Sequence, residues 1–155
     1  MTVGFLSLLI VFPIGLIYGG ISGYYGGIID TLMMRFAEAI MAIPSFYLLI
    51  ILAAILPSGM TSVQRFALIV VILALIGWSG FARVVRGMVL SIKNEDFVQA
   101  EKTLGASDWR IILKHILPQT TSYVIIAMTL SVPSYILAES GLSFLGLGIQ
   151  QPDAS

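Results

Sequence analysis

Long apolar runs are the feature that most limits how this chain can fold. The run FALIVVILALIGWSGF, residues 66–81, holds no charged residue, and further apolar runs begin near residues 3, 36 and 122. A helix that crosses the hydrocarbon core of a membrane needs about 20 predominantly apolar residues. The runs lack the alternation of apolar and polar residues that marks half-buried strands. We therefore predict an all-α membrane protein with spans at about residues 3–18, 36–56, 66–90 and 122–147.

Composition agrees with this class and excludes several kinds of site. The chain is 58% hydrophobic and 10% charged, whereas soluble domains carry about 25% charged residues. The formal net charge of zero gives no electrostatic reason to expect a nucleic-acid partner. The chain has no cysteine, and its one histidine, His115, cannot form a metal site alone. We expect the lipid bilayer as a partner, and no catalytic residue, metal site or bound cofactor.

A glycine-rich stretch, GGISGYYGGIID, follows the first predicted span at residues 19–30. Five glycines in so short a stretch are typical of a helix break. We predict a flexible turn near the lipid headgroups, with Tyr24 and Tyr25 as interface aromatics. Since no strand precedes the stretch and no lysine follows it, a phosphate-binding loop is disfavoured. Asp30 or Thr31 is predicted to cap the next helix.

Few charged residues lie in the predicted spans. Arg35 and Glu38 are three residues apart, so they can pair on one helix face. The alternative is an ionisable pair on a transport path within the membrane. Glu139 would lie about 31 Å along a helix from Pro118, near the far membrane face. A role for Glu139 inside the bundle is the alternative.

Residues 91–118, SIKNEDFVQAEKTLGASDWRIILKHILP, form a polar segment between two apolar runs. Eight of the sixteen charged residues of the chain lie in it. Arg83 and Arg86 precede it and are predicted to mark the cytoplasmic end of a helix. Seven of the eight Lys and Arg residues fall on one predicted side, with Arg65 on the other. Because positive residues favour the cytoplasmic side, we predict that the segment is cytoplasmic.

The pattern within this segment predicts a helical hairpin. Asn94 is the expected N-cap of a first helix that ends at Leu104, and Gly105 suits a left-handed turn. Ser107 or Asp108 would cap a second helix, which Pro118 would end. Each arm is predicted to carry an apolar stripe. The stripes are Phe97, Ala100 and Leu104 on the first arm, and Trp109, Ile112, Leu113 and Ile116 on the second.

Two interpretations of the hairpin follow from its periodicity. It could lie on the bilayer surface with Trp109 as an anchor. It could instead present a short helix to a groove on a soluble partner. The second interpretation explains why both arms carry stripes and why the turn is sharp.

The segments QAEKTLG (99–105) and IILKHILP (111–118) resemble the cytoplasmic loop of ABC importer permeases. That loop has a Glu-Ala-Ala triplet, then three residues and a Gly, and after a spacer an Ile/Leu-Pro ending. The longer segments 77–118 and ESGLSFLGLGIQQPDAS (139–155) resemble the dipeptide, oligopeptide and nickel permease group, and the similarity covers nearly the whole chain. Ala100, Gly105 and Pro118 match the pattern, whereas Gln99 replaces the usual Glu and Glu101 the usual Ala.

The resemblance implies a type I ABC importer permease fold in a prokaryotic cytoplasmic (inner) membrane. Residues 1–155 would form one incomplete permease domain with about four transmembrane helices and a cytoplasmic hairpin, and further spans would lie before and after it. The implied partners are ATP-binding subunits, a second permease subunit that is a different chain, and an extracytoplasmic substrate-binding protein. ATP and Mg would bind to the ATP-binding subunit, since this chain has no phosphate loop with a lysine.

By this resemblance residues 91–118 form the coupling loop that receives force from the ATPase. Its predicted contact residues are Gln99, Ala100, Glu101, Gly105, Ala106, Ser107, Asp108, Trp109, Arg110 and Pro118. Ser131, Ser134 and Ser140 are candidates for a path for the expected peptide substrate, although small residues also serve helix packing. The alternatives are a channel or secondary-transporter subunit without an ATPase partner, and a structural anchor. The near absence of charges in the middle of the spans disfavours a channel.

Overall fold

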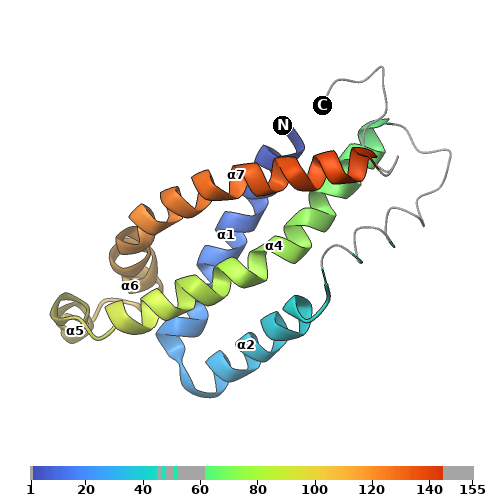
Figure 1. The fold of residues 1–155 in the computed structure, drawn as a ribbon. Coiled ribbons are helices and arrows are strands. Elements are labelled where there is room, and N and C mark those ends of the chain that lie inside the picture. Colours follow the sequence, from blue (N-terminus) through green and yellow to red (C-terminus); the bar gives the residue numbers. More distant parts are fainter. Residues whose placement is uncertain (1, 45–46, 48–50, 52–61, 145–155) are drawn as a thin grey trace.

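The structure, a computed structural model, describes residues 2–44, 47, 51 and 62–144 (Figure 1). Its long helices are α1 (Thr2–Tyr25), α2 (Gly27–Met41), α4 (Ser62–Ile92) and α7 (Thr121–Phe144). Between α4 and α7 lie α5 (Asp96–Thr103), α6 (Asp108–Ile111), the π-helical turn η1 (Ile112–Ile116) and the 3-10 turn η2 (Leu117–Thr120). Helices and their connecting turns make up the described part, which confirms the all-α class.

The helices α1 and α4 pack along each other, and α2 and α7 both contact α1 (Figure 1). Within the described residues, three helical stretches are long and apolar enough to cross a membrane: Leu6–Tyr25, Ala67–Ile92 and Asp108–Leu137. The predicted spans at 36–56 and 122–147 extend outside the described residues, so the four-span arrangement stays a prediction. The side chains of Arg65 and Glu139 also lie outside the described part.

The predicted helix break at residues 19–30 is confirmed in position and wrong in extent. Helix α1 continues through Gly19 and Gly23 to Tyr25, and the chain turns only at Gly26 and Gly27, with φ of 66° and 58°. The glycines of α1 instead let α4 approach closely. A Cβ added at Gly19 would lie 2.8 Å from the Cβ of Val85, and one at Gly23 would lie 2.8 Å from the carbonyl oxygen of Arg86. Glycines four apart in an apolar run are the signal of such packing.

The predicted cap of the second helix is also wrong. Gly26 precedes α2, and Asp30 lies buried in the first turn of the helix. The hydroxyl of Thr31 donates to the carbonyl oxygen of Gly27 at 2.9 Å, within the helix. The predicted pair of Arg35 and Glu38 is confirmed, with Nη1 of Arg35 3.0 Å from Oε2 of Glu38 on the exposed face of α2.

Two buried clusters hold the helices together. The first joins α1, α2 and α4 and contains Leu8, Val11, Phe12, Ala37, Ala74, Trp78 and Ala82. The second joins the ends of α1 and α4 to the polar segment and contains Tyr24, Val85, Val89, Val98, Ile111, Ile112 and Ile116. Because lipid is as apolar as these side chains, close packing rather than removal from water holds helices together inside a bilayer. The second cluster therefore fixes the polar segment to the long helices.

Candidate functional site

Residues 91–118 form a hairpin of short helices at one end of the long helices (Figure 1). Gly105 makes the turn between α5 and α6 with φ of 79°, as the sequence predicts. Its N–H donates to the carbonyl oxygen of Lys102 at 3.0 Å. A Cβ at Gly105 would meet nothing within 4 Å. The glycine is therefore needed for its left-handed backbone and not for space.

The helix boundaries differ from the predicted ones at two places. Glu95, and not Asn94, directly precedes α5. The Asn94 amide instead donates to the carbonyl oxygen of Leu90 at 3.3 Å, at the end of α4. Ser107 precedes α6, which is one of the two predicted alternatives.

Pro118 does not end the second helix, contrary to the prediction. The chain runs from α6 through η1 and η2 directly into α7. Proline lacks an N–H and clashes with the preceding turn of an α-helix. Here Pro118 lies at the start of the 3-10 turn, and the wider π-helical turn precedes it. The change of helix type lets the chain pass the proline without a break.

The predicted apolar stripe is exposed on the first arm and is divided between buried and exposed positions on the second. On the first arm Val98 is buried, whereas Phe97 and Leu104 are exposed. On the second arm Ile112 and Ile116 are buried together with Ile111, but Trp109 and Leu113 are each 52% exposed. The π-helical turn explains the division of the second stripe, because the spacing i, i+3, i+4 and i+7 no longer marks one face there.

The hairpin therefore carries large apolar side chains that nothing in the described chain covers. Leu104 is 81% exposed, and Phe97, Trp109 and Leu113 are also exposed. Among the predicted contact residues, Glu101 and Ala106 are half-buried. The exposed ones are Gln99, Ala100, Gly105, Ser107, Asp108, Trp109, Arg110 and Pro118.

The two triplet positions that depart from the family pattern contact the hairpin itself. The Gln99 side chain donates to the carbonyl oxygen of Lys93 at 2.9 Å. Oε1 of Glu101 lies 3.6 Å from Nε2 of His115, which links α5 to η1. These contacts hold the first arm against the end of α4 and against the second arm.

Tyr24 joins α1 to the hairpin, which sequence reasoning missed. Its side chain is buried within the protein. Its hydroxyl donates to Oδ1 of Asp108 at 2.7 Å. Nζ of Lys102 lies 5.0 Å from the centroid of the Tyr24 ring, within cation–π range. The signal that could have suggested this role was the position of an aromatic residue two positions before the Gly26-Gly27 turn.

A cluster of three polar side chains, Ser22, Asp30 and Arg86, joins α1, α2 and α4. Nε of Arg86 lies 2.8 Å from Oδ1 of Asp30, and Nη2 of Arg86 also contacts Oδ2. The Ser22 hydroxyl donates to Oδ1 of Asp30 at 2.5 Å. The hydrogen bond from Arg86 holds the pKa of Asp30 below its usual value, although burial opposes this shift and the Ser22 bond adds to it. Arg86 lies near the end of α4, and it also forms an ion pair with Asp30 inside the protein.

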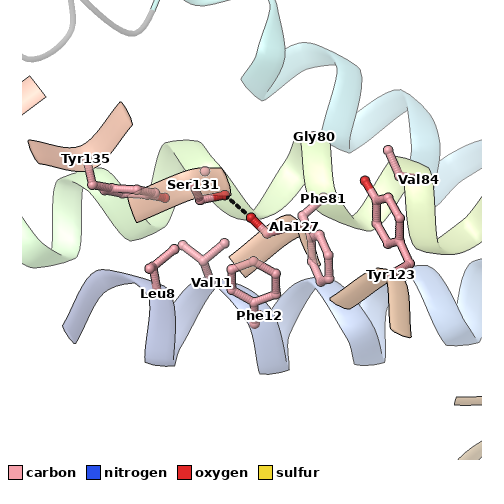
Figure 2. Close-up of a pocket in the computed structure, with 11 residues that line it drawn as sticks. Leu8, Val11, Phe12, Gly80, Phe81, Val84, Tyr123, Ala127, Ser131 and Tyr135 are labelled. Carbon is pink, nitrogen blue, oxygen red and sulfur yellow. Dashed lines mark hydrogen bonds between the residues drawn. The ribbon is translucent and has the colours of Figure 1, made fainter. Parts of the chain in front are cut away.

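Helices α1, α4 and α7 enclose a pocket of about 240 Å³ (Figure 2). Its walls are mostly apolar, with hydroxyls from Tyr123, Ser131 and Tyr135 of α7. The Ser131 hydroxyl donates to the carbonyl oxygen of Ala127 at 2.7 Å. Ser134 and Ser140 are exposed elsewhere on α7. Within the described residues, no group of three or more His, Asp or Glu side chains could hold a metal ion.

Comparison with known proteins identifies the family. Residues 12–155 match the sequence profile described as the binding-protein-dependent transport system inner membrane component. The chain belongs to this family. The predicted resemblance and the predicted permease-type helical fold are thereby confirmed. Membership and the three long apolar helices together define a multi-pass membrane protein.

Curated relatives within the family are permeases for peptides. The chain is 50% identical to the dipeptide transport system permease protein DppC of Bacillus subtilis, covering 99% of the chain and 46% of the relative. It is 43% identical to the oligopeptide permease protein OppC of the same organism, over 92% of the chain and 45% of the relative. It is 36% identical to the glutathione transport system permease protein GsiD of Pectobacterium atrosepticum, over 98% of the chain and 48% of the relative. The chain therefore spans about half the length of these relatives.

Proposed function

We propose that this chain is part of a permease subunit of an ATP-driven importer for peptides and that residues 91–118 couple it to a cytoplasmic ATPase. The observation that carries this proposal is the exposure of large apolar side chains on the hairpin, with Leu104 81% exposed and Trp109 52% exposed. Relatives named for dipeptide, oligopeptide and glutathione transport support peptides as the substrate class.

The hairpin is suited to dock into a groove on a soluble subunit. Apolar side chains on short helices are a common means of groove recognition. Trp and Arg are also enriched among the residues that dominate binding energy, and Trp109 and Arg110 lie next to each other in α6. Val98 and Ile111 fix the opposite side of the hairpin to the long helices. A push on the exposed face would therefore move the hairpin and the helix ends together.

The proposed assembly follows from the same features. ATP and Mg would bind to the separate ATP-binding subunit, and this chain would not hydrolyse ATP. A second permease subunit and an extracytoplasmic substrate-binding protein would complete the importer. The excess of Lys and Arg around the hairpin supports a cytoplasmic position for the loop of this inner-membrane protein.

Part of the substrate path is proposed at the pocket between α1, α4 and α7. The hydroxyls of Tyr123, Ser131 and Tyr135 could exchange hydrogen bonds with a peptide backbone inside otherwise apolar walls (Figure 2). Ser134 and Ser140, which are exposed on α7, would line a path only along the outer side of that helix.

The decisive test is loop-dependent capture of the ATP-binding subunit. The natural protein that carries this chain is purified in mild detergent with its transporter, as parent and as Leu104→Asp. We expect the ATP-binding subunit to co-purify with the parent and to be lost from Leu104→Asp, because a carboxylate would be desolvated in the groove. Thr103→Asp, at an exposed neighbouring position of α5, is the matched control and should retain the subunit.

A parent protein that captures no ATP-binding subunit would contradict the proposal. It would favour a channel or a secondary transporter instead. Capture that is equal in parent and Leu104→Asp would show that the hairpin face is not the contact, and would favour a hairpin that lies on lipid.

A further inference from the structure

The end of α1 makes a side-chain hydrogen bond to the hairpin through Tyr24. Tyr24 is the penultimate residue of α1, yet it is only 7% exposed. Its hydroxyl donates to Oδ1 of Asp108, 84 positions later in the chain. Asp108 is the first residue of α6. This hydrogen bond therefore connects a candidate membrane span directly to the second arm of the hairpin.

Other parts of the hairpin approach the same tyrosine. Lys102 of α5 places its ammonium group over the Tyr24 ring. Lys93, just after α4, places Nζ 3.4 Å from the carbonyl oxygen of Tyr24. The ring also belongs to the buried cluster that contains Val98 of α5 and Ile111 of α6. Tyr24 thus contacts both arms and the entry to the hairpin.

Behind Tyr24, helix α1 is held tightly to α4. A Cβ at Gly23 would lie 2.8 Å from the Arg86 carbonyl oxygen, so the two backbones are in close contact there. Ser22 bonds to Asp30, which pairs with Arg86. Immediately after Tyr25 the chain turns at Gly26 with φ of 66°. Tyr24 is therefore the last buried side chain of a well-fixed helix end, and its hydrogen bond joins that end directly to α6.

We propose that Tyr24 is a positioning residue for coupling and that its bond to Asp108 transmits movement of the hairpin to α1. This inference rests on the proposed role of residues 91–118 as a coupling loop. A hydrogen bond to a carboxylate is stronger than a neutral one, so it can set the angle of α6 against α1 under load. The apolar contacts of the ring alone would allow the two to slide.

The test compares Tyr24→Phe with the parent in the assembled transporter, reconstituted in lipid with its ATP-binding subunits and binding protein. Phenylalanine keeps the ring, its packing and the contact with Lys102, and removes only the hydroxyl. We expect normal assembly and about a tenfold fall in peptide taken up per ATP hydrolysed. Tyr25→Phe is the matched control, because Tyr25 is exposed and its ring contact with Tyr24 is retained. It should couple like the parent.

Asp108 variants show whether the effect passes through the hydrogen bond. Asp108→Asn keeps an acceptor oxygen and should lose less coupling than Asp108→Ala. The double variant Tyr24→Phe/Asp108→Ala should be no worse than the poorer single variant, because both remove the same bond. Additive losses would overturn the proposal, as would a Tyr24→Phe transporter that couples normally.

Two further outcomes distinguish a failure of this inference from a failure of the proposed function on which it rests. If Tyr24→Phe lowers only the yield of assembled complex and each complex couples normally, Tyr24 is an anchor and the proposal fails. If the parent transporter shows no ATPase stimulated by its binding protein, the proposed function itself fails. A coupled parent with an unaffected Tyr24→Phe variant removes only the role of Tyr24.

Discussion

Arg86 of α4 and Asp30 of α2 form a two-point ion pair, with Nε of Arg86 2.8 Å from Oδ1 of Asp30. The Asp30 side chain is 10% exposed and the Arg86 side chain 33%. The residues are 56 positions apart, and the pair closes the junction of three helices because Ser22 of α1 also bonds to Asp30. A charge pair that is this well buried is weak evidence of net stabilisation, but removal of one partner is costly.

Asp30→Ala should destabilise the protein by about 2 kcal/mol. Loss of one partner of a fully buried pair costs about 3–5 kcal/mol, and Arg86 is partly solvated, so the cost is smaller. The measurement is the thermal unfolding midpoint in detergent. Glu38→Ala is the matched control, because it breaks the exposed pair with Arg35, and should cost less than about 1 kcal/mol. Equal losses in the two variants would contradict the interpretation of Asp30 as a buried anchor.

The same ion pair makes the stability of the folded protein depend on pH. The hydrogen bond from Arg86 lowers the pKa of folded Asp30 below its ordinary value of 3.8. The stabilisation is therefore present above the unfolded pKa and is lost as the pH falls through the lower folded pKa. The difference in unfolding midpoint between parent and Asp30→Asn should shrink as the pH is lowered from about 6 to about 3. A difference that stays constant over this range would show that the carboxylate charge contributes nothing.

Local patterns predicted those parts of the structure that depend on neighbouring residues. The length and polarity of the apolar runs predicted the all-α class. The φ requirement at Gly105 and the i, i+3 spacing of Arg35 and Glu38 are equally local, and both are confirmed. The family resemblance depended on motifs in the polar segment, and it is also confirmed.

The errors came from contacts between residues distant in sequence. The glycines of α1 look like helix breakers until α4 is placed against them, because only then is the missing Cβ an advantage. The sequence suggests that Asp30 caps a helix, and only its contact with Arg86, 56 positions away, shows that it forms an ion pair instead. In the hairpin, η1 shifts the register of the second arm, so Trp109 is exposed and Ile111 is buried. Helical periodicity alone cannot reveal a π-helical turn.

Gly19→Ala should destabilise the pairing of α1 and α4. The new Cβ would lie 2.8 Å from the Cβ of Val85, so the helices would have to separate. Overpacking of this kind costs about 1–3 kcal/mol. Gly80→Ala in α4 is the matched control, because a Cβ there meets nothing within 4 Å. It should be neutral or slightly stabilising, since alanine favours helices. Thermal unfolding of both variants in detergent decides the point, and a neutral Gly19→Ala would contradict the close packing.

Gly105→Ala should weaken coupling without loss of the membrane fold. The left-handed conformation at φ of 79° costs a residue with a Cβ about 1–2 kcal/mol, so the turn between α5 and α6 would relax and move the exposed face that includes Leu104. Gly87→Ala is the matched control, because its Cβ also meets open space but it lies within α4. In the assembled transporter we expect lower substrate-stimulated ATPase and uptake for Gly105→Ala and parent-like values for Gly87→Ala. Parent-like coupling in a normally assembled Gly105→Ala transporter would show that the geometry of this turn does not matter for energy transfer, and that the docking face tolerates a displaced hairpin tip.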